Sequence, residues 1–516
     1  MSNEEHRDFW PFGIAKELIS GWEAERHVIT TGVSMSGDPH IGNANDVIRG
    51  DAIRLALEKL GAKAELVWIS DDMDPFRSVP AGMPQEMEDY LGVPAALIPD
   101  FWDDGHKDFI EHFEEKFLRQ LAEVGVKPTV KRGIDMYRAG EYNESIKVAM
   151  GKRGEVAEIL NKFKQVKLGE GWYPINVICE KCSKISTTVI KGYDEESCEA
   201  EYFCNDETVL LQRKNPVRGC GHSGKVSVLD GHAKITWRVE WPARWSFLGT
   251  TCEPFGKEHS SAGGSWDTGK EIAEKVFGYK APHPVVYEHF LVNGEKMSKS
   301  KGNVITVDDM LRYMLPQHLR YWMFQGRLTI AKNIVLKDIS PRVFDEFDRA
   351  ELAYFDPESV EDERERNNLA SAYELSMSGK IPTEMVHIPF AEMKSLVESG
   401  EKIKTGGGIA EKKVEIVRNW VRDFEPKKEE AKLEVEIGDA ERRVLRDLIE
   451  VIESEKGGDE LQTGIFEVAK RNGMRPADFF RLVYGVLLGS DKGPRLGPYI
   501  AETGKAKVIG KLKNAI

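Results

Sequence analysis

The chain has 516 residues, of which 41% are hydrophobic and 31% charged, and its formal net charge is −14. This composition is typical of a soluble globular protein and excludes fibrous and disordered classes, while the length predicts two to four domains. No apolar run is long enough for a membrane span, and the N-terminus lacks the pattern of a secretion signal. We therefore expect a cytoplasmic enzyme. The acidic charge argues against coating of nucleic acid but permits local basic surfaces.

A βαβ unit is predicted near the N-terminus. Residues 27–37 form a β-branched run that leads into a glycine-containing turn, residues 44–60 have a helical pattern, and residues 64–70 form a second apolar run. This order predicts a parallel sheet with a right-handed crossover. Ligands of such sheets bind at the carboxyl ends of the strands beside helix N-termini, so residues 32–46 are a predicted nucleotide site.

The pattern changes twice further along the chain. From about 172 to 235, short β-like runs alternate with cysteines and turns, which indicates a small inserted module. Helix and strand alternate again over residues 245–295. Beyond about residue 335, charged runs with helical period dominate, so we expect a helical C-terminal domain.

The tetrapeptide HIGN, His40 to Asn43, falls at the predicted strand-to-helix turn. An imidazole at a helix N-terminus can donate to ATP phosphate oxygens as negative charge moves toward pyrophosphate. Gly42 allows a nucleotide to approach the backbone, and Asn43 adds a neutral donor. Taken alone, such a tetrapeptide is more often an ordinary turn.

A second motif, KMSKS, runs from Lys296 to Ser300 and is followed by Lys301 and Gly302. Flexible ammonium groups suit a triphosphate whose charge moves during reaction, although a solvated basic loop is a common alternative. An early HIGN followed far downstream by KMSKS is a paired pattern, and chance explains the pair poorly. The pair resembles the class I aminoacyl-tRNA synthetases.

Longer segments narrow this resemblance to the class I lysyl-tRNA synthetases. They are SDDMDPFR (70–77), WRVEWPARW (237–245), EPFGKEHSSAGGSWDTG (253–269) and YEHFLVNGEKMSKSKGN (287–303). The likeness extends to about residue 330, and the helical remainder matches in character. It implies ATP-dependent activation of L-lysine to lysyl-adenylate and transfer to the 3′ end of tRNA(Lys), with Mg²⁺ accompanying ATP.

The resemblance also implies an α/β fold, with a Rossmann-like parallel-sheet catalytic domain, an inserted zinc-ribbon-like module and an all-α anticodon-binding domain. The expected boundaries are 1–170 for the first catalytic half with HIGN, 171–235 for the zinc-binding module, 236–335 for the second catalytic half with KMSKS, and 336–516 for the helical tRNA-binding domain.

Catalytic roles carry over to the matching positions. The resemblance implies that His40, Asn43, Lys296 and Lys299 stabilise the reacting phosphates. The ATP-binding set that it implies is His40, Gly42, Asn43, Asp267, Met297, Ser298 and Lys299. Asp267 is expected to hold the ribose or the HIGN turn, and its alternative is a helix cap.

The lysine-binding residues implied by the resemblance are Gly32, Ser34, Asp46, Trp237, His259 and Tyr287. For the aromatic side chains, plain core packing is the alternative. The family tends to have Thr in place of Ser34 and usually Glu in place of Asp46. A buried ε-ammonium requires a carboxylate, and Asp46 is one methylene shorter than the family residue, so Glu240 is a second candidate.

Cysteines crowd into residues 179–220, and Cys179-x-x-Cys182 has the spacing of a zinc knuckle. We expect structural zinc bound by Cys179, Cys182, Cys204 and Cys220. His222 and Cys198 remain alternatives for the fourth ligand. Some family members have a second metal site, whose equivalents here are Asp100 and His112 without a cysteine nearby, so no second site is predicted.

Three other functions compete with lysine activation. One is a class I synthetase for another amino acid such as glutamate, which would require an arginine in the substrate pocket. Another is a paralogue that binds nucleotide or tRNA without catalysis, which the intact HIGN and KMSKS motifs argue against. A plain nucleotidyltransferase does not explain the helical C-terminal third. The sequence gives no indication of oligomeric state.

Overall fold

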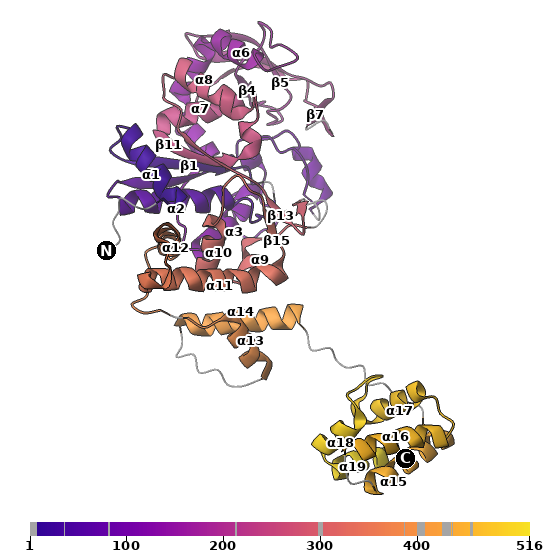
Figure 1. Ribbon diagram of the computed structural model, residues 1–516. Helices are drawn as coiled ribbons and strands as arrows, with labels where there is room; N and C mark the ends of the chain where they lie inside the picture. The colour runs from indigo at the N-terminus through magenta and orange to yellow at the C-terminus, as the bar shows by residue number, and fades with distance from the viewer. Residues whose placement is uncertain are drawn as a thin grey trace. The chain divides into compact units, whose positions relative to one another are not determined.

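The structure is a computed structural model that describes residues 8–35, 37–80, 83–211, 214–297, 303–385, 387–399, 408–425, 435, 437–454 and 458–516. The chain divides into two compact units, Met1–Val421 and Arg422–Ile516. Figure 1 labels the helices and strands of both. The two units are described separately.

The first unit is built around a five-stranded parallel sheet. In sheet order its strands are β12 (His283–Tyr287), β11 (Thr250–Gly256), β1 (His27–Val33), β2 (Ala64–Ser70) and β3 (Thr129–Arg132). Strands β2 and β3 follow β1 on one side, whereas β11 and β12 extend the sheet on the other. The strand order therefore reverses between β1 and β11, where ligands of open α/β sheets bind. The predicted α/β class with a parallel sheet is confirmed.

Helices cover both faces of this sheet. Helix α2 (Asn45–Lys59) lies on one face, where α1 (Trp10–Gly21) packs against it, while α7 (Trp237–Leu248) and α8 (Ser265–Lys275) lie on the other (Figure 1). Helix α2 approaches the strands closely because residue 50 is glycine: a Cβ there would lie 2.9 Å from Leu66 Cδ1. Because α2 follows β1 in the chain, its N-terminus lies at the carboxyl edge of the sheet.

Between β2 and the inserted module, the chain is mainly helical. The elements are η2 (Gln85–Tyr90), η3 (Ala95–Leu97), α3 (Phe109–Glu123), α4 (Gly133–Arg138), α5 (Asn143–Gly151) and α6 (Arg153–Asn161). The module itself is antiparallel, with sheets β5-β6-β9, β10-β4 and β7-β8. Its strands are β4 (Ile175–Val177), β5 (Thr188–Asp194), β6 (Glu199–Cys204), β7 (Val209–Leu211), β8 (Asn215–Val217), β9 (Ser223–Ser227) and β10 (Ala233–Ile235).

After β11, the 3₁₀ turn η4 (Lys257–Ser260) precedes α8, and a small sheet in the order β14-β13-β15 follows β12. Its strands are β13 (Phe290–Val292), β14 (Glu295–Lys296) and β15 (Lys332–Ile334). The remaining elements of the first unit are α9 (Val307–Leu311), α10 (Pro316–Phe324), α11 (Leu336–Phe355), η6 (Pro357–Ser359), α12 (Glu363–Ser376) and α13 (Phe390–Ser399). Helix α14 (Gly408–Phe424) crosses the division between the units.

The second unit contains helices around one apolar core. They are α15 (Asp439–Ser454), α16 (Gly458–Arg471), α17 (Pro476–Leu488), α18 (Leu496–Thr503) and α19 (Lys505–Ala515). The predicted helical region from residue 336 is thus shared between the units, because α11 packs on α12 and α13 within the first. In the parts of the chain that the structure describes, no helix combines the length and apolarity needed to cross a membrane.

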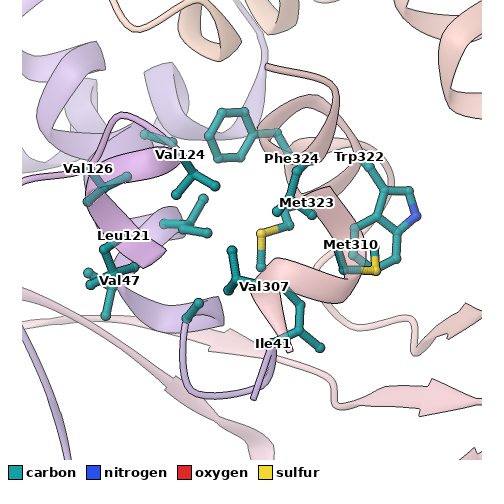
Figure 2. Packing of buried hydrophobic residues seen from close by; sticks show 14 of the residues in the cluster. Ile41, Val47, Leu121, Val124, Val126, Val307, Met310, Trp322, Met323 and Phe324 are labelled. Atoms are coloured by element: carbon teal, nitrogen blue, oxygen red, sulfur yellow. The ribbon is translucent and has the colours of Figure 1, made fainter. Parts of the chain in front are cut away.

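The largest apolar cluster joins the turn after β1 to the region that follows KMSKS. Ile41 is completely buried and belongs to the same cluster as Val307 and Met310 of α9 and Met323 of α10 (Figure 2). The Ile41 amide also donates to the carbonyl of Ile305 at 2.9 Å. This packing holds two distant stretches of the sequence together.

One buried ion pair connects three helices of this unit. Arg320 on α10 lies 2.7 Å from Asp51 on α2 through Nη2, which also donates to the carbonyl of Leu375 at the end of α12. Both charged side chains are 1% exposed. Asp51 also contacts Arg54 at 2.6 Å, so loss of Arg320 leaves this buried carboxylate with one of its two cationic partners. The contacts of Arg320 with α2 and α12 constrain how the three helices pack.

We therefore expect Arg320→Ala to lower the free energy of unfolding by about 1.5–3 kcal/mol, because a buried charged hydrogen bond is lost while Arg54 still pairs with Asp51. Urea unfolding followed by circular dichroism measures the change. The matched control is Arg119→Ala, which removes an arginine that is 52% exposed and pairs with Glu123 and Asp308, and its expected cost is at most about 1 kcal/mol. Equal effects of the two substitutions would contradict this account.

Candidate active site

The HIGN turn lies between β1 and α2 and is ordered by its own side chains. The His40 Nδ1 atom accepts a hydrogen bond from the Gly42 amide at 3.1 Å, and the Asn43 side chain accepts one from the His40 amide at 2.9 Å. An accepting Nδ1 carries no proton, so the neutral ring has its proton on Nε2. Position 42 must be glycine, since a Cβ there would lie 2.8 Å from the imidazole. The turn thus presents an N–H donor.

The beginning of the KMSKS segment lies beside this turn. Lys296 ends β14 and is exposed, and the Met297 methyl group lies 3.4 Å from where a Cβ of Gly42 would be. The hydrogen bond from the Ile41 amide to the Ile305 carbonyl ties the chain that follows KMSKS to the same turn. The two motifs therefore flank one place in the fold. The predicted site residues Ser298 and Lys299 lie outside the described residues.

A cavity of about 200 Å³ opens at the carboxyl ends of β1, β11 and β12. Most of the predicted substrate-binding residues line it, namely Gly32, Gly42, Asn43, Asp46, Trp237, His259 and Tyr287. The cavity is at the reversal of strand order, as expected for a parallel α/β sheet. Its position beside the HIGN turn places a bound molecule next to His40 and Asn43.

Aromatic side chains form one wall of this cavity. Trp237 and Trp241 are one helical turn apart on α7, and their rings stack with centroids 5.5 Å apart. The His259 ring lies 5.5 Å from Trp241, and burial lowers the pKa of His259, which favours the neutral ring. Tyr287 ends β12 and is buried. These groups suit an aliphatic chain.

Two buried carboxyl groups line the same cavity. Asp46, in the first turn of α2, accepts from the Val47 amide at 3.0 Å, and burial raises its pKa to about 8. Glu253, in the middle of β11, accepts from Thr30 at 2.7 Å and from Trp241 Nε1 at 2.6 Å, and burial raises its pKa to about 7. The sequence analysis did not identify Glu253, although an acidic residue within a short apolar strand is an unusual signal.

The alternative lysine carboxylate, Glu240, is engaged elsewhere. It forms a buried ion pair with Lys234 of the inserted module and accepts from the Tyr137 hydroxyl at 2.8 Å. Its charge is therefore compensated within the protein, and it is absent from the lining of the cavity. This geometry favours Asp46 over Glu240.

A second ion pair borders the cavity beside Gly32. Arg244 on α7 contacts Asp71, at the end of β2, at 2.6 Å. A Cβ at Gly32 would lie 3.4 Å from Arg244 Nη1 and 3.6 Å from Asp71 Oδ2. Glycine thus leaves space between this pair and a ligand. The sequence analysis missed both charged residues because their pairing joins segments 173 positions apart.

Like His40, Lys296 and Met297, the predicted residues Ser34 and Asp267 lie outside the lining of this cavity. Ser34 is exposed, donates to Asp74 at 3.2 Å and borders an adjacent cavity of about 90 Å³ that Asp71 also lines. Asp267 accepts from the Gly263 amide at 3.1 Å and lies 3.7 Å from Lys270. Asp267 lies in the first turn of α8, where it contacts the preceding loop, and its expected role toward ATP stays a prediction.

The inserted module brings four cysteines together. The Sγ atoms of Cys179, Cys182, Cys204 and Cys220 all lie within 4.8 Å of one another. The pairs Cys179–Cys220 and Cys182–Cys204 are 3.6 Å apart. Tetrahedral Zn²⁺ with bonds of about 2.3 Å requires sulfurs about 3.8 Å apart, so this set fits zinc.

The alternative fourth ligands point elsewhere. Cys198 Sγ donates to the carbonyl of Glu195 at 3.6 Å, in the turn between β5 and β6. His222 packs its ring against Tyr202, and its carbonyl accepts from the Cys204 amide. Neither side chain belongs to the cysteine cluster.

Another cluster of potential metal ligands follows η3. Asp104 contacts both His106 and His112, and ligand atoms of the three residues lie within 4.8 Å of one another. Asp100, the residue paired with His112 in the sequence analysis, is not part of this cluster. Its carboxylate accepts hydrogen bonds from the backbone amides of Trp102 and Asp104. Asp104, His106 and His112 come together because the loop that carries Asp104 and His106 folds against α3, which carries His112.

Comparison with known proteins identifies the family. A family model described as "tRNA synthetases class I (K)" matches residues 8–379. The chain belongs to this family. The resemblance found from the motifs is confirmed.

This class I synthetase is similar to proteins of nearly the same length. It is 32% identical to "Lysine--tRNA ligase" of Methanosphaera stadtmanae, over 98% of this chain and 99% of that protein. It is 35% identical to "Lysine--tRNA ligase" of Methanocaldococcus jannaschii, over 97% and 98%, and 33% identical to that of Pyrococcus horikoshii, over 98% and 99%. The similarity includes the C-terminal helices.

The raised pKa of Asp46 predicts how stability depends on pH in this synthetase. Between about pH 4 and pH 8 the folded protein retains a proton that the unfolded chain has lost, so the free energy of unfolding falls as pH rises. Asp46→Asn removes this loss. We expect the variant to be more stable than the native protein, by an amount that is small near pH 4, grows to several kcal/mol near pH 8 and then stays constant.

Thermal unfolding from pH 5 to pH 9, without ligands, measures this difference. Asp38→Asn serves as the control because Asp38 is 65% exposed. A difference between Asp46→Asn and native protein that does not change with pH would show that the Asp46 carboxyl is not penalised by burial.

The cysteine cluster predicts the metal content of this synthetase. We expect about one zinc per chain in the purified protein, and loss of that zinc in Cys182→Ser with a lower unfolding temperature. Cys198→Ser should retain the metal, because Cys198 lies outside the cluster. Elemental analysis by mass spectrometry decides between the outcomes, and equal zinc in both variants would exclude this cluster as the site.

Proposed function

We propose that this class I synthetase activates L-lysine with ATP and transfers it to the 3′ end of tRNA(Lys). The observation that carries the proposal is the cavity beside the HIGN turn, where an aromatic wall leads to the buried Asp46 carboxyl. A long aliphatic chain ending in an ammonium group complements these surfaces. Relatives named lysine--tRNA ligase, matched over nearly the full length, support the same substrate.

In the proposed reaction, the lysine carboxylate attacks the α-phosphorus of ATP and pyrophosphate leaves with the electrons of the broken P–O bond. His40, through Nε2–H, and Asn43 donate to the phosphates, while Lys296 and Lys299 neutralise the departing pyrophosphate. Met297 and Ser298 belong to the same proposed ATP site. Mg²⁺ bound to ATP would offset phosphate charge. Orientation and electrostatic stabilisation supply the rate enhancement, without a covalent enzyme intermediate.

In the second step, a hydroxyl of the terminal tRNA ribose attacks the lysyl carbonyl and AMP leaves. We assign anticodon recognition to the helical region 336–516 and a structural role to the zinc module. A cytoplasmic location is part of the same proposal. The charge of the cavity argues against glutamate, since Arg244, which lines the cavity, already pairs with Asp71.

The test is lysine-dependent exchange between ATP and pyrophosphate, followed by aminoacylation of tRNA. We expect His40→Ala to slow exchange by about 10²–10³-fold, because a single donor to the developing negative charge is lost. His387→Ala is the matched control, since His387 pairs with Asp348 away from the cavity.

Each result has a distinct meaning. Exchange with glutamate but not lysine would overturn the substrate assignment. Adenylate formation without tRNA charging would favour the paralogue that lacks full catalysis. An unchanged rate in His40→Ala would remove His40 from the mechanism.

A further inference from the structure

Buried acidic side chains of the first unit are generally paired with a basic one. Among the described residues, such ion pairs involve Asp51, Asp71, Asp72, Asp108, Glu114, Glu240, Asp348 and Glu374. Glu351, which is also buried, accepts a hydrogen bond from the Tyr373 hydroxyl at 3.1 Å and lies outside the cavity. This pattern follows from the cost of burying a charge without a counter-ion.

Asp46 and Glu253 depart from this pattern. Both are buried, with exposures of 8% and 6%, and neither forms an ion pair with any residue that the structure describes. The positive charge of Arg244 lowers the pKa of Glu253, but the ion pairs of Arg244 are with Asp71 and Glu240. The two unpaired carboxyl groups line the same cavity.

The surroundings of Glu253 hold its carboxylate in one orientation. Thr30 and Trp245 donate to Oε2, and Trp241 donates to Oε1. All three donors are neutral, so they orient the group without compensating its charge. A carboxylate has about four acceptor sites, and one therefore remains for a further donor.

The two carboxyl groups also interact with each other. Burial and, to a smaller extent, the charge of Glu253 raise the pKa of Asp46, and backbone amides lower it, with a net pKa of about 8. Burial raises the pKa of Glu253 to about 7. An ammonium group that enters the cavity supplies the counter-charge of one ionised carboxylate, so it would replace one of the bound protons.

We infer that Glu253 is a second lysine-binding carboxylate, which receives the substrate ε-ammonium together with Asp46. This inference rests on the proposed function and names a residue that determines its specificity. Buried carboxyl groups favour an ammonium over a methyl or amide group of similar size, because a neutral ligand supplies no counter-charge.

The first test compares Glu253→Gln with native protein in exchange assays at pH 8. We expect the KM for lysine to rise about 10²-fold or more while the KM for ATP stays within about twofold. The control is Glu374→Gln, which removes a buried carboxylate that pairs with Lys59, and its KM for lysine should not change. Equal losses for lysine and ATP in Glu253→Gln would indicate a structural role and overturn the inference.

A second test avoids dependence on the folding of Glu253→Gln. Asp46→Asn preserves Glu253 and its three donors, so its lysine affinity should still fall as pH decreases through about 7, and it should still prefer lysine to norleucine, which lacks the ammonium. Other titratable or charged groups bordering the cavity are Asp71, Arg244, Glu258, His259 and Tyr287, and they are the same in both proteins.

Calorimetric binding of lysine and norleucine from pH 5.5 to pH 8.5 provides the measurement. Affinity of Asp46→Asn that is independent of pH and equal for both ligands would assign the ammonium to Asp46 alone. If the native protein still shows lysine-dependent exchange between ATP and pyrophosphate, that result would leave the proposed function intact. Absence of lysine-dependent exchange in native protein would instead refute the function itself.

Discussion

The burial of Ile41 is the constraint on which the rest of the site depends. This side chain lies in the middle of the HIGN turn, yet it is fully enclosed, and its amide bonds to Ile305 beyond KMSKS. A turn that was only a surface connection would not determine where His40 and Asn43 lie. Because apolar packing holds the turn from beneath, the positions of its polar side chains are set without any contribution from a ligand. Preorganised donors of this kind are worth more than flexible ones.

The charged side chains around the cavity are of two kinds, those paired within the protein and those without an ion-pair partner among the described residues. The Arg244–Asp71 ion pair lines the cavity and the Lys234–Glu240 pair lies outside its lining, and in both pairs the charges are compensated within the protein. Asp46 and Glu253 lack such partners among the described residues and have raised pKa values. The stability lost by burying them is recovered only when a cation binds. Substrate selectivity and a local loss of stability therefore have the same origin.

The inserted module contributes to the catalytic unit through a buried contact. Lys234 on β10 pairs with Glu240 on α7, the helix that carries Trp237 and Trp241. The module thus stabilises the helix that forms the aromatic wall. A metal bound by the four cysteines would hold the strands that precede β10, so zinc would influence the cavity through packing and not through chemistry.

The sequence by itself determined the βαβ unit, the motif pair and the cysteine cluster, because these depend on local periodicity and short spacing. It also identified seven of the sixteen residues that line the cavity, such as Asp46 and His259, through resemblance. It did not identify Glu253, and it did not decide between Asp46 and Glu240. Only tertiary structure decided those points, since Glu253 bonds to Thr30 across 223 positions. Whether a buried charge is compensated depends on contacts between distant segments, which no local pattern records.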